Sequence, residues 1–96
     1  MVILDLAEND LFDGAAFYEK QSPGLSWYFL DSLYSDIESL RLHASVHAIR
    51  SEYYRALSRR FPYAIYYKFV DSEIHVWRVL DCRRDPRWLK KALDER

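Results

Sequence analysis

Arginine and aromatic side chains gather in the carboxyl-terminal half of the chain, and this combination suits contacts with nucleic acid. Arginine binds phosphate through paired hydrogen bonds and keeps its charge. Tyrosine and tryptophan can stack on bases. The sequence therefore predicts a phosphate- or base-binding surface formed by Arg59, Arg60, Arg83, Tyr66 and Trp88. The alternative is that this charge is solvated surface or pairs with acidic residues of the same fold.

The charge is divided unevenly between the two halves. Residues 1–48 hold eight acidic and two basic side chains, a net charge of −6. Residues 49–96 hold seven acidic and twelve basic ones, a net charge of +5. A small domain with this distribution can bind a polyanion with one side and present an acidic face elsewhere.

Several other chemistries lack their sequence motifs. The sequence contains no GxGxxG, P-loop, HExxH, CxxC or nucleophile elbow. His43 and His47 have the four-residue spacing of two metal ligands on a helix, but no third ligand is evident nearby. We therefore expect neither a metal nor a cofactor.

Length and composition indicate one globular domain spanning residues 1–96. The single Cys82 excludes an internal disulfide framework and fits a reducing compartment. No early stretch has the pattern of a signal peptide, and no run approaches the roughly 20 apolar residues of a membrane span. We expect a cytoplasmic protein with no membrane contact.

Three runs rich in aromatic and β-branched residues predict strands at Tyr53–Leu57, Tyr63–Val70 and Ile74–Leu80. Their short joins, including Asp71-Ser72, permit only antiparallel neighbours. Val2-Ile3-Leu4 either adds a strand to this sheet or begins the first helix. Residues 43–51 are expected to form a connection.

Apolar periodicity predicts three helices. The first covers about Glu8 to Gln21, and the second runs from a Ser22-Pro23 start to about Leu42. A short third helix begins at Asp85-Pro86, with Leu89, Ala92 and Leu93 on one side.

The resulting fold class is α+β in the order βααβββα, with a helical hairpin packed on a twisted antiparallel sheet. We expect Phe29, Leu33, Ile37 and Leu40 to pack on Ile65, Tyr67 and Val76. Alternation in the second strand of the meander places Ala64, Tyr66, Lys68 and Val70 on the opposite, open face.

Two segments resemble the RelE/ParE superfamily of bacterial toxins. They are R-x-L-x-x-R-F-P-Y-A-I-Y-Y at residues 55–67 and I-x-V-x-R-V-L-D-x-R-R-D-P at residues 74–86. The amino-terminal half fits as well, with F-Y-E in the first helix and S-P-G-L before the second. The resemblance implies the toxin of a two-gene toxin–antitoxin module, neutralised by a cognate antitoxin protein that wraps around it.

The resemblance leaves three activities open. The first is ribosome-dependent mRNA cleavage, in which Arg84 would stabilise the phosphorane charge, Arg55 would position a phosphate and Asp81 would take a proton. Ala64 and Asp81 depart from that pattern, because some RNA-cleaving relatives carry arginine and many carry histidine there. The second is ParE-like inhibition of DNA gyrase, favoured by W-R-V-L-D-x-R-R-D. The third is a catalytically inactive protein-binding module.

Overall fold

The computed structural model describes residues 1–43, 48–50 and 52–95, and side-chain surroundings are described for these ranges except at 48–50. Within them the chain is α+β, with helices packed on a mixed sheet. The strands are β1 (Val2–Ile3), β2 (Ala48–Arg50), β3 (Tyr53–Leu57), β4 (Tyr63–Val70) and β5 (Glu73–Asp81). The helices are α1 (Asp5–Gln21), α2 (Leu25–Glu38), α3 (Leu40–His43) and α4 (Pro86–Asp94).

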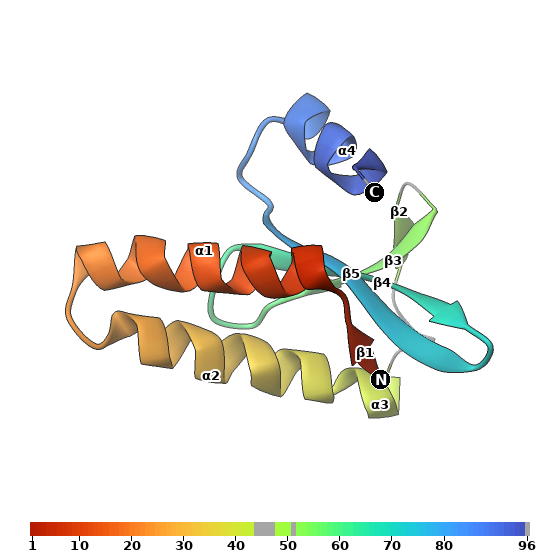
Figure 1. Cartoon of the computed structure of the whole chain (residues 1–96), viewed down its shortest axis with the longest axis horizontal. Coiled ribbons are helices and arrows are strands. Elements are labelled where there is room, and N and C mark those ends of the chain that lie inside the picture. The colour runs from red at the N-terminus through yellow and green to blue at the C-terminus, as the bar shows by residue number, and fades with distance from the viewer. Residues whose placement is uncertain (44–47, 51, 96) are drawn as a thin grey trace.

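The sheet order is β1-β5-β4-β3-β2, and every neighbouring pair is antiparallel except β1 with β5 (Figure 1). The predicted three-stranded meander is confirmed as β3, β4 and β5. The amino-terminal strand is also confirmed, but its parallel pairing makes the sheet mixed rather than purely antiparallel. Strand β2 falls where a connection was expected.

The β4–β5 hairpin turns at Asp71 and Ser72, as predicted. Both residues have positive φ angles, 50° and 66°, which suit a two-residue hairpin loop. The paired residues Val70 and Glu73 flank the turn. Further along, Tyr66 pairs with Arg78 and Tyr67 with Val76, so Trp77 is one extra residue on β5. This irregularity is a β-bulge.

Helix α2 corrects the prediction at both ends. It begins at Leu25 rather than at Ser22-Pro23, because Gly24 adopts a left-handed φ of 87°. The carboxylate of Glu19 accepts hydrogen bonds from the Gly24 and Ser26 amides, at 3.1 and 3.0 Å, and so replaces a serine cap. The predicted long helix also breaks at Ser39, whose hydroxyl donates to the Asp36 carbonyl at 2.6 Å.

Two apolar clusters lie on opposite faces of the sheet. The hairpin of α1 and α2 covers one face, and the predicted packing of Phe29, Leu33, Ile37 and Leu40 on the sheet is confirmed. On the other face α4 packs against the sheet through Leu89, Ala92 and Leu93. The face predicted to be open is therefore covered in part, and both Ala64 and Tyr66 are buried there.

Candidate functional site

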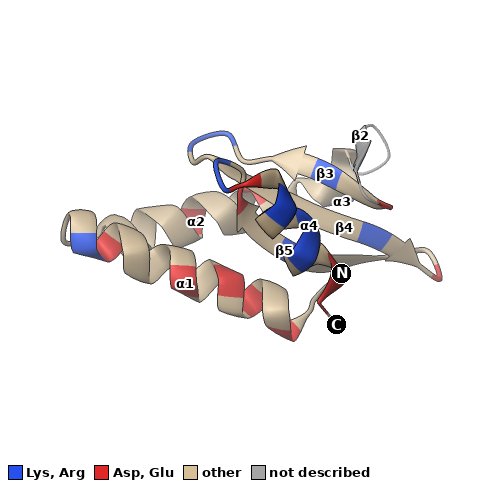
Figure 2. Cartoon of the chain, turned by 90° about the horizontal axis from the view of Figure 1, so that it is seen from above, with Lys and Arg blue, Asp and Glu red and all other residues tan. Residues whose placement is uncertain are grey.

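Two basic turns lie next to each other at one end of the sheet. The turn between β3 and β4 carries Arg59 and Arg60, and the turn after β5 carries Arg83 and Arg84. They are joined because the Cys82 amide donates to the Pro62 carbonyl at 2.9 Å. Figure 2 shows the two basic turns, coloured blue, together at this end and the positions of acidic residues, coloured red, along α1. Four of the predicted cations are thus brought to one end of the molecule.

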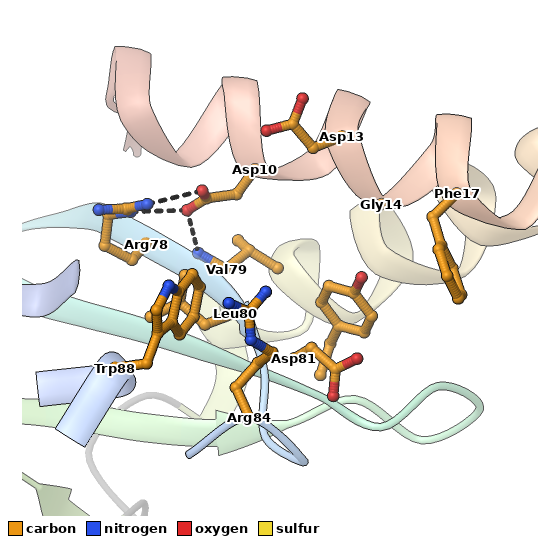
Figure 3. A pocket seen from close by; sticks show the side chains of 11 residues that line it. Asp10, Asp13, Gly14, Phe17, Arg78, Val79, Leu80, Asp81, Arg84 and Trp88 are labelled. Atoms are coloured by element: carbon orange, nitrogen blue, oxygen red, sulfur yellow. Dashed lines mark hydrogen bonds and ion pairs between the residues drawn. The ribbon is translucent and has the colours of Figure 1, made fainter. Parts of the chain in front are cut away.

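A cavity of about 390 Å³ opens between α1, the end of β5 and the start of α4 (Figure 3). Asp13 and Phe17 line it from α1, and Trp88 lines it from α4. Arg84 and Asp81 complete the side formed by the β5–α4 connection. The cavity thus has an acidic and aromatic wall from α1 opposite a cationic and aromatic corner.

The guanidinium of Arg84 stacks on the ring of Trp88, with its central carbon 3.8 Å from the ring centroid. Trp88 sits in the first turn of α4, where Asp85 caps the helix by accepting from the Arg87 amide at 2.8 Å. This confirms the predicted Asp85-Pro86 helix start. Among the described residues, Arg84 has no carboxylate partner for its side chain. The stack therefore presents an oriented cation to the cavity.

Asp81 is paired with Arg83 rather than with Arg84. Its two carboxylate oxygens accept from Arg83 Nε at 3.0 Å and Nη2 at 2.7 Å, and the Arg83 amide adds a third bond at 2.9 Å. The hydrogen bonds from the Arg83 side chain hold the pKa of Asp81 below its ordinary value. A carboxylate in this state is ionised but is a weak proton acceptor.

Tyr63 is a cavity residue to which the sequence analysis gave no functional role. It lies opposite Asp81 in the β4–β5 pairing and also lines the cavity. Burial raises the pKa of Tyr63 to about 12, and the charge of Asp81 adds to the effect. Its phenol is therefore neutral at physiological pH and can donate a hydrogen bond into the cavity.

Arg55 and Tyr66 lie elsewhere. They line a second cavity of about 350 Å³ between β3, β4 and α4, together with Leu89, Lys90 and Leu93. Tyr66 is only 3% exposed, so its ring has no free face on which a base could stack while α4 is docked. The structure therefore separates Arg55 from Arg84, although both were assigned to one catalytic group.

Arg59 and Arg60 are both attached to α2. Asp36, a buried residue of α2, accepts from the Ser58 hydroxyl at 2.7 Å and from Arg59 Nε at 3.3 Å. The Arg59 side chain is still 75% exposed and can meet an external anion. Arg60 lies over the ring of Tyr28 at 5.9 Å. The anchoring residue Asp36 was missed because its partners are 22 and 23 positions away.

Asp10 and Arg78 form a second ion pair that sequence reasoning missed. Arg78 donates to the two carboxylate oxygens of Asp10 at 2.7 and 2.8 Å, across 68 positions of sequence. The hydrogen bond to Asp10 raises the pKa of Arg78 further above its ordinary value. Both residues line the main cavity.

Metal binding finds no support in the described part of the chain, where no group of three or more histidine, cysteine, aspartate or glutamate side chains could hold an ion. His43 is exposed at the end of α3, and His47 lies outside the described residues. Across the same residues, no helix is both long enough and apolar enough to cross a membrane.

Comparison with known proteins does not assign a family. No protein-family model matches the chain, and no curated protein matches its sequence.

Proposed function

We propose that this protein is the toxin of a type II toxin–antitoxin module with a RelE/ParE-like fold. The proposal rests on one observation: the two sequence segments that resemble this superfamily lie next to each other in the structure. Residues 55–67 and 74–86 form adjacent strands, and the Cys82 amide bonds to the Pro62 carbonyl at their shared end. The two segments therefore meet in space and form one structural unit, and its turns present four arginines.

We infer that inhibition by binding, as in ParE-like toxins that act on DNA gyrase, fits the geometry better than RNA cleavage. Cleavage requires a proton acceptor close to the groups that hold the phosphate. Asp81 is occupied by Arg83, and Arg55 lines a different cavity from Arg84. A binding protein needs only the exposed cations and the Arg84–Trp88 stack. The segment from Trp77 to Asp85 also resembles the ParE branch.

Ribosome-dependent mRNA cleavage is the second candidate, and one observation favours it. Arg84, Asp81 and Tyr63 line the same cavity, so a phosphate held by Arg84 would have both a carboxylate and a neutral phenol within the same cavity. If Asp81 released Arg83 and bound a substrate hydroxyl instead, Asp81 and Tyr63 would resemble a general base and a general acid.

The proposed antitoxin is a protein with acidic side chains at the segment that meets the basic turns. Charge complementarity favours such a partner, because Arg83 is exposed and Arg84 has no carboxylate partner in the described structure. The sheet face that was predicted to be open is occupied in part by α4. The rim formed by Arg59, Arg60, Arg83 and Arg84 is therefore the better docking surface.

Inducible expression with two readouts tests the proposal. Growth arrest with intact transcripts and lost DNA supercoiling would support gyrase inhibition, whereas breaks in transcripts by primer extension would support cleavage. Arg84→Ala should abolish either effect. Arg87→Ala is the matched control, because Arg87 lies three positions away, is 93% exposed and pairs only locally with Asp85. A wild-type chain that never slows growth would overturn the toxin proposal.

Co-expression with the neighbouring gene tests the partner. We expect a stable complex that weakens when Arg83 and Arg84 are both changed to Ala. Equal recovery of the wild-type and doubly changed chains in a pull-down would contradict the docking surface.

A further inference from the structure

One buried guanidinium contacts three elements of the fold. Arg78 of β5 donates through Nε and Nη2 to Asp10 of α1, and through Nη1 to the Ala92 carbonyl of α4 at 2.7 Å. The Arg78 residue is only 7% exposed. The same Asp10 carboxylate accepts from the Val79 amide at 3.0 Å. Arg78 and Asp10 therefore fix α1 and α4 against a single point of the sheet.

The β-bulge explains why Arg78 can do this. The extra residue Trp77 interrupts the pairing with β4 just before Arg78, and such a bulge redirects the side chains that follow it. Strand β1 pairs with β5 only at His75 and Val76. Beyond that point Asp10 takes the place of a neighbouring strand for the Val79 amide, so α1 is bonded directly to the edge of β5.

Helices α1 and α4 are also the two walls of the main cavity. Figure 3 shows the Asp10–Arg78 pair at one end of it, with Asp13 and Phe17 further along α1. Trp88 of α4 lines the facing side and carries the Arg84 guanidinium. A shift of α4 relative to α1 would therefore change the distance between Trp88, with the Arg84 guanidinium stacked on it, and the wall formed by Asp13 and Phe17.

Helix α4 depends on such contacts for its position. It has nine residues, which is too short for a stable helix in isolation. Its polar anchors to the sheet include two bonds from Arg78, to the Ala92 carbonyl at 2.7 Å and to the Glu95 carboxylate at the helix end at 3.5 Å. The Tyr53 hydroxyl adds a bond to the Leu93 carbonyl at 3.3 Å. The apolar contacts of Leu89, Ala92 and Leu93 determine which side of α4 faces the sheet. Because such contacts are not directional, they do not by themselves fix the position of the helix.

We propose that Arg78 is a positioning residue that sets the opening of the cavity by holding α1 and α4 at fixed places on β5. Its effect on activity rests on the proposed function, whereas its effect on geometry does not. Arginine is required because its planar fork donates to Asp10 and to Ala92 at once. Lysine offers one compact ammonium group and cannot reproduce this arrangement.

Amide hydrogen exchange and the indole NMR signal of Trp88 test this in the full chain. Arg78→Met removes both contacts and should raise exchange in α4 by about ten- to a hundredfold relative to β4, as expected for loss of charged hydrogen bonds. Arg78→Lys keeps a charge beside Asp10, so it should raise exchange in α4 while leaving α1 protected. In both variants the Trp88 signal should move.

Arg83→Met is the matched control, because Arg83 also binds an aspartate at 2.7 Å but lies within a single exposed turn. It should leave exchange in α4 unchanged. If Arg78→Lys also left α4 exchange and the Trp88 signal at wild-type values, the proposal would be overturned. Growth arrest is measured separately. If the cavity is the functional site, Arg78→Lys should weaken arrest, whereas Arg84→Ala should abolish it. Absence of arrest in the wild type would overturn the toxin function alone.

Discussion

Gly14 leaves no room for a side chain, and Gly14→Ala should destabilise the protein although alanine is the better helix former. A Cβ at this position would lie 2.5 Å from Phe29 Cζ and 3.1 Å from the Tyr63 hydroxyl. Phe29 is fully buried and contacts the rings of Tyr18, Phe61 and Tyr63 at centroid distances of 5.2, 5.0 and 5.0 Å. The ring therefore cannot move aside without disturbing this aromatic cluster.

The expected magnitude follows from two opposing terms. Overpacking a well-filled core costs about 1–3 kcal/mol. Replacing a helical glycine by alanine returns about 1 kcal/mol. The two terms leave a net loss of about 0–2 kcal/mol. The upper end, about 2 kcal/mol, is expected here, because the new Cβ would lie 2.5 Å from a ring that is packed against three others. For a domain of this size that loss lowers the midpoint of thermal unfolding by roughly 8–16 °C. Urea unfolding at neutral pH, followed by circular dichroism, measures the free energy directly.

Two further variants isolate the two terms. Ala16 is exposed on the same helix, so Ala16→Gly reports the glycine–alanine difference without any packing change. Phe29→Leu shortens the side chain that the new Cβ meets, so Gly14→Ala should cost less in that background, with a coupling of about 1 kcal/mol or more. A Gly14→Ala protein as stable as the wild type would refute the close approach of α1 to Phe29.

Three other measurements probe the core and the cavity. Leu33→Ala should lower the free energy of unfolding by about 2–5 kcal/mol in urea titrations, and a change within error would show that α2 does not pack through Leu33. The folded-state pKa of Asp81 is depressed, so its stabilising contribution is present above the unfolded pKa of about 3.9 and is lost as pH falls through the lower folded value. The difference in stability between wild type and Asp81→Asn should therefore shrink between pH 7 and pH 2, and an unchanged difference would contradict the pairing with Arg83. Ultraviolet titration should place the ionisation of Tyr63 at about 12, and a Tyr63→Phe difference spectrum centred near 10 would mean that this phenol is not buried.

The meander and the hairpin were predictable because their signals are local. Aromatic and β-branched runs predicted β3, β4 and β5, and the spacing of Leu33, Ile37 and Leu40 predicted the buried face of the second helix. The break at Ser39 was not predicted, since the apolar repeat continues through Leu40. The helix instead ends where the Ser39 hydroxyl bonds to a backbone carbonyl.

The packing of α4 on the second face of the sheet could have been predicted from the sequence of this helix. Its Leu89, Ala92 and Leu93 form an apolar stripe, and the small Ala64 opposite leaves space for a helix. An amphipathic helix must bury its stripe somewhere, and the hairpin already occupied the first face. Strand alternation placed Tyr66 on a face that was expected to be open, but its ring packs beneath α4 with the apolar residues.

The candidate site was less predictable than the fold, because its geometry depends on which aspartate each arginine meets. Arg83 and Arg84 are adjacent in sequence and chemically identical, yet Arg83 is bound to Asp81 while Arg84 stacks on Trp88. In the sequence, Arg78 is a charged residue within an otherwise apolar strand. In the structure, the bulge at Trp77 directs its side chain to Asp10, 68 positions earlier. The sequence identified these arginines, whereas the contacts of the folded chain decide which of them meets an aspartate.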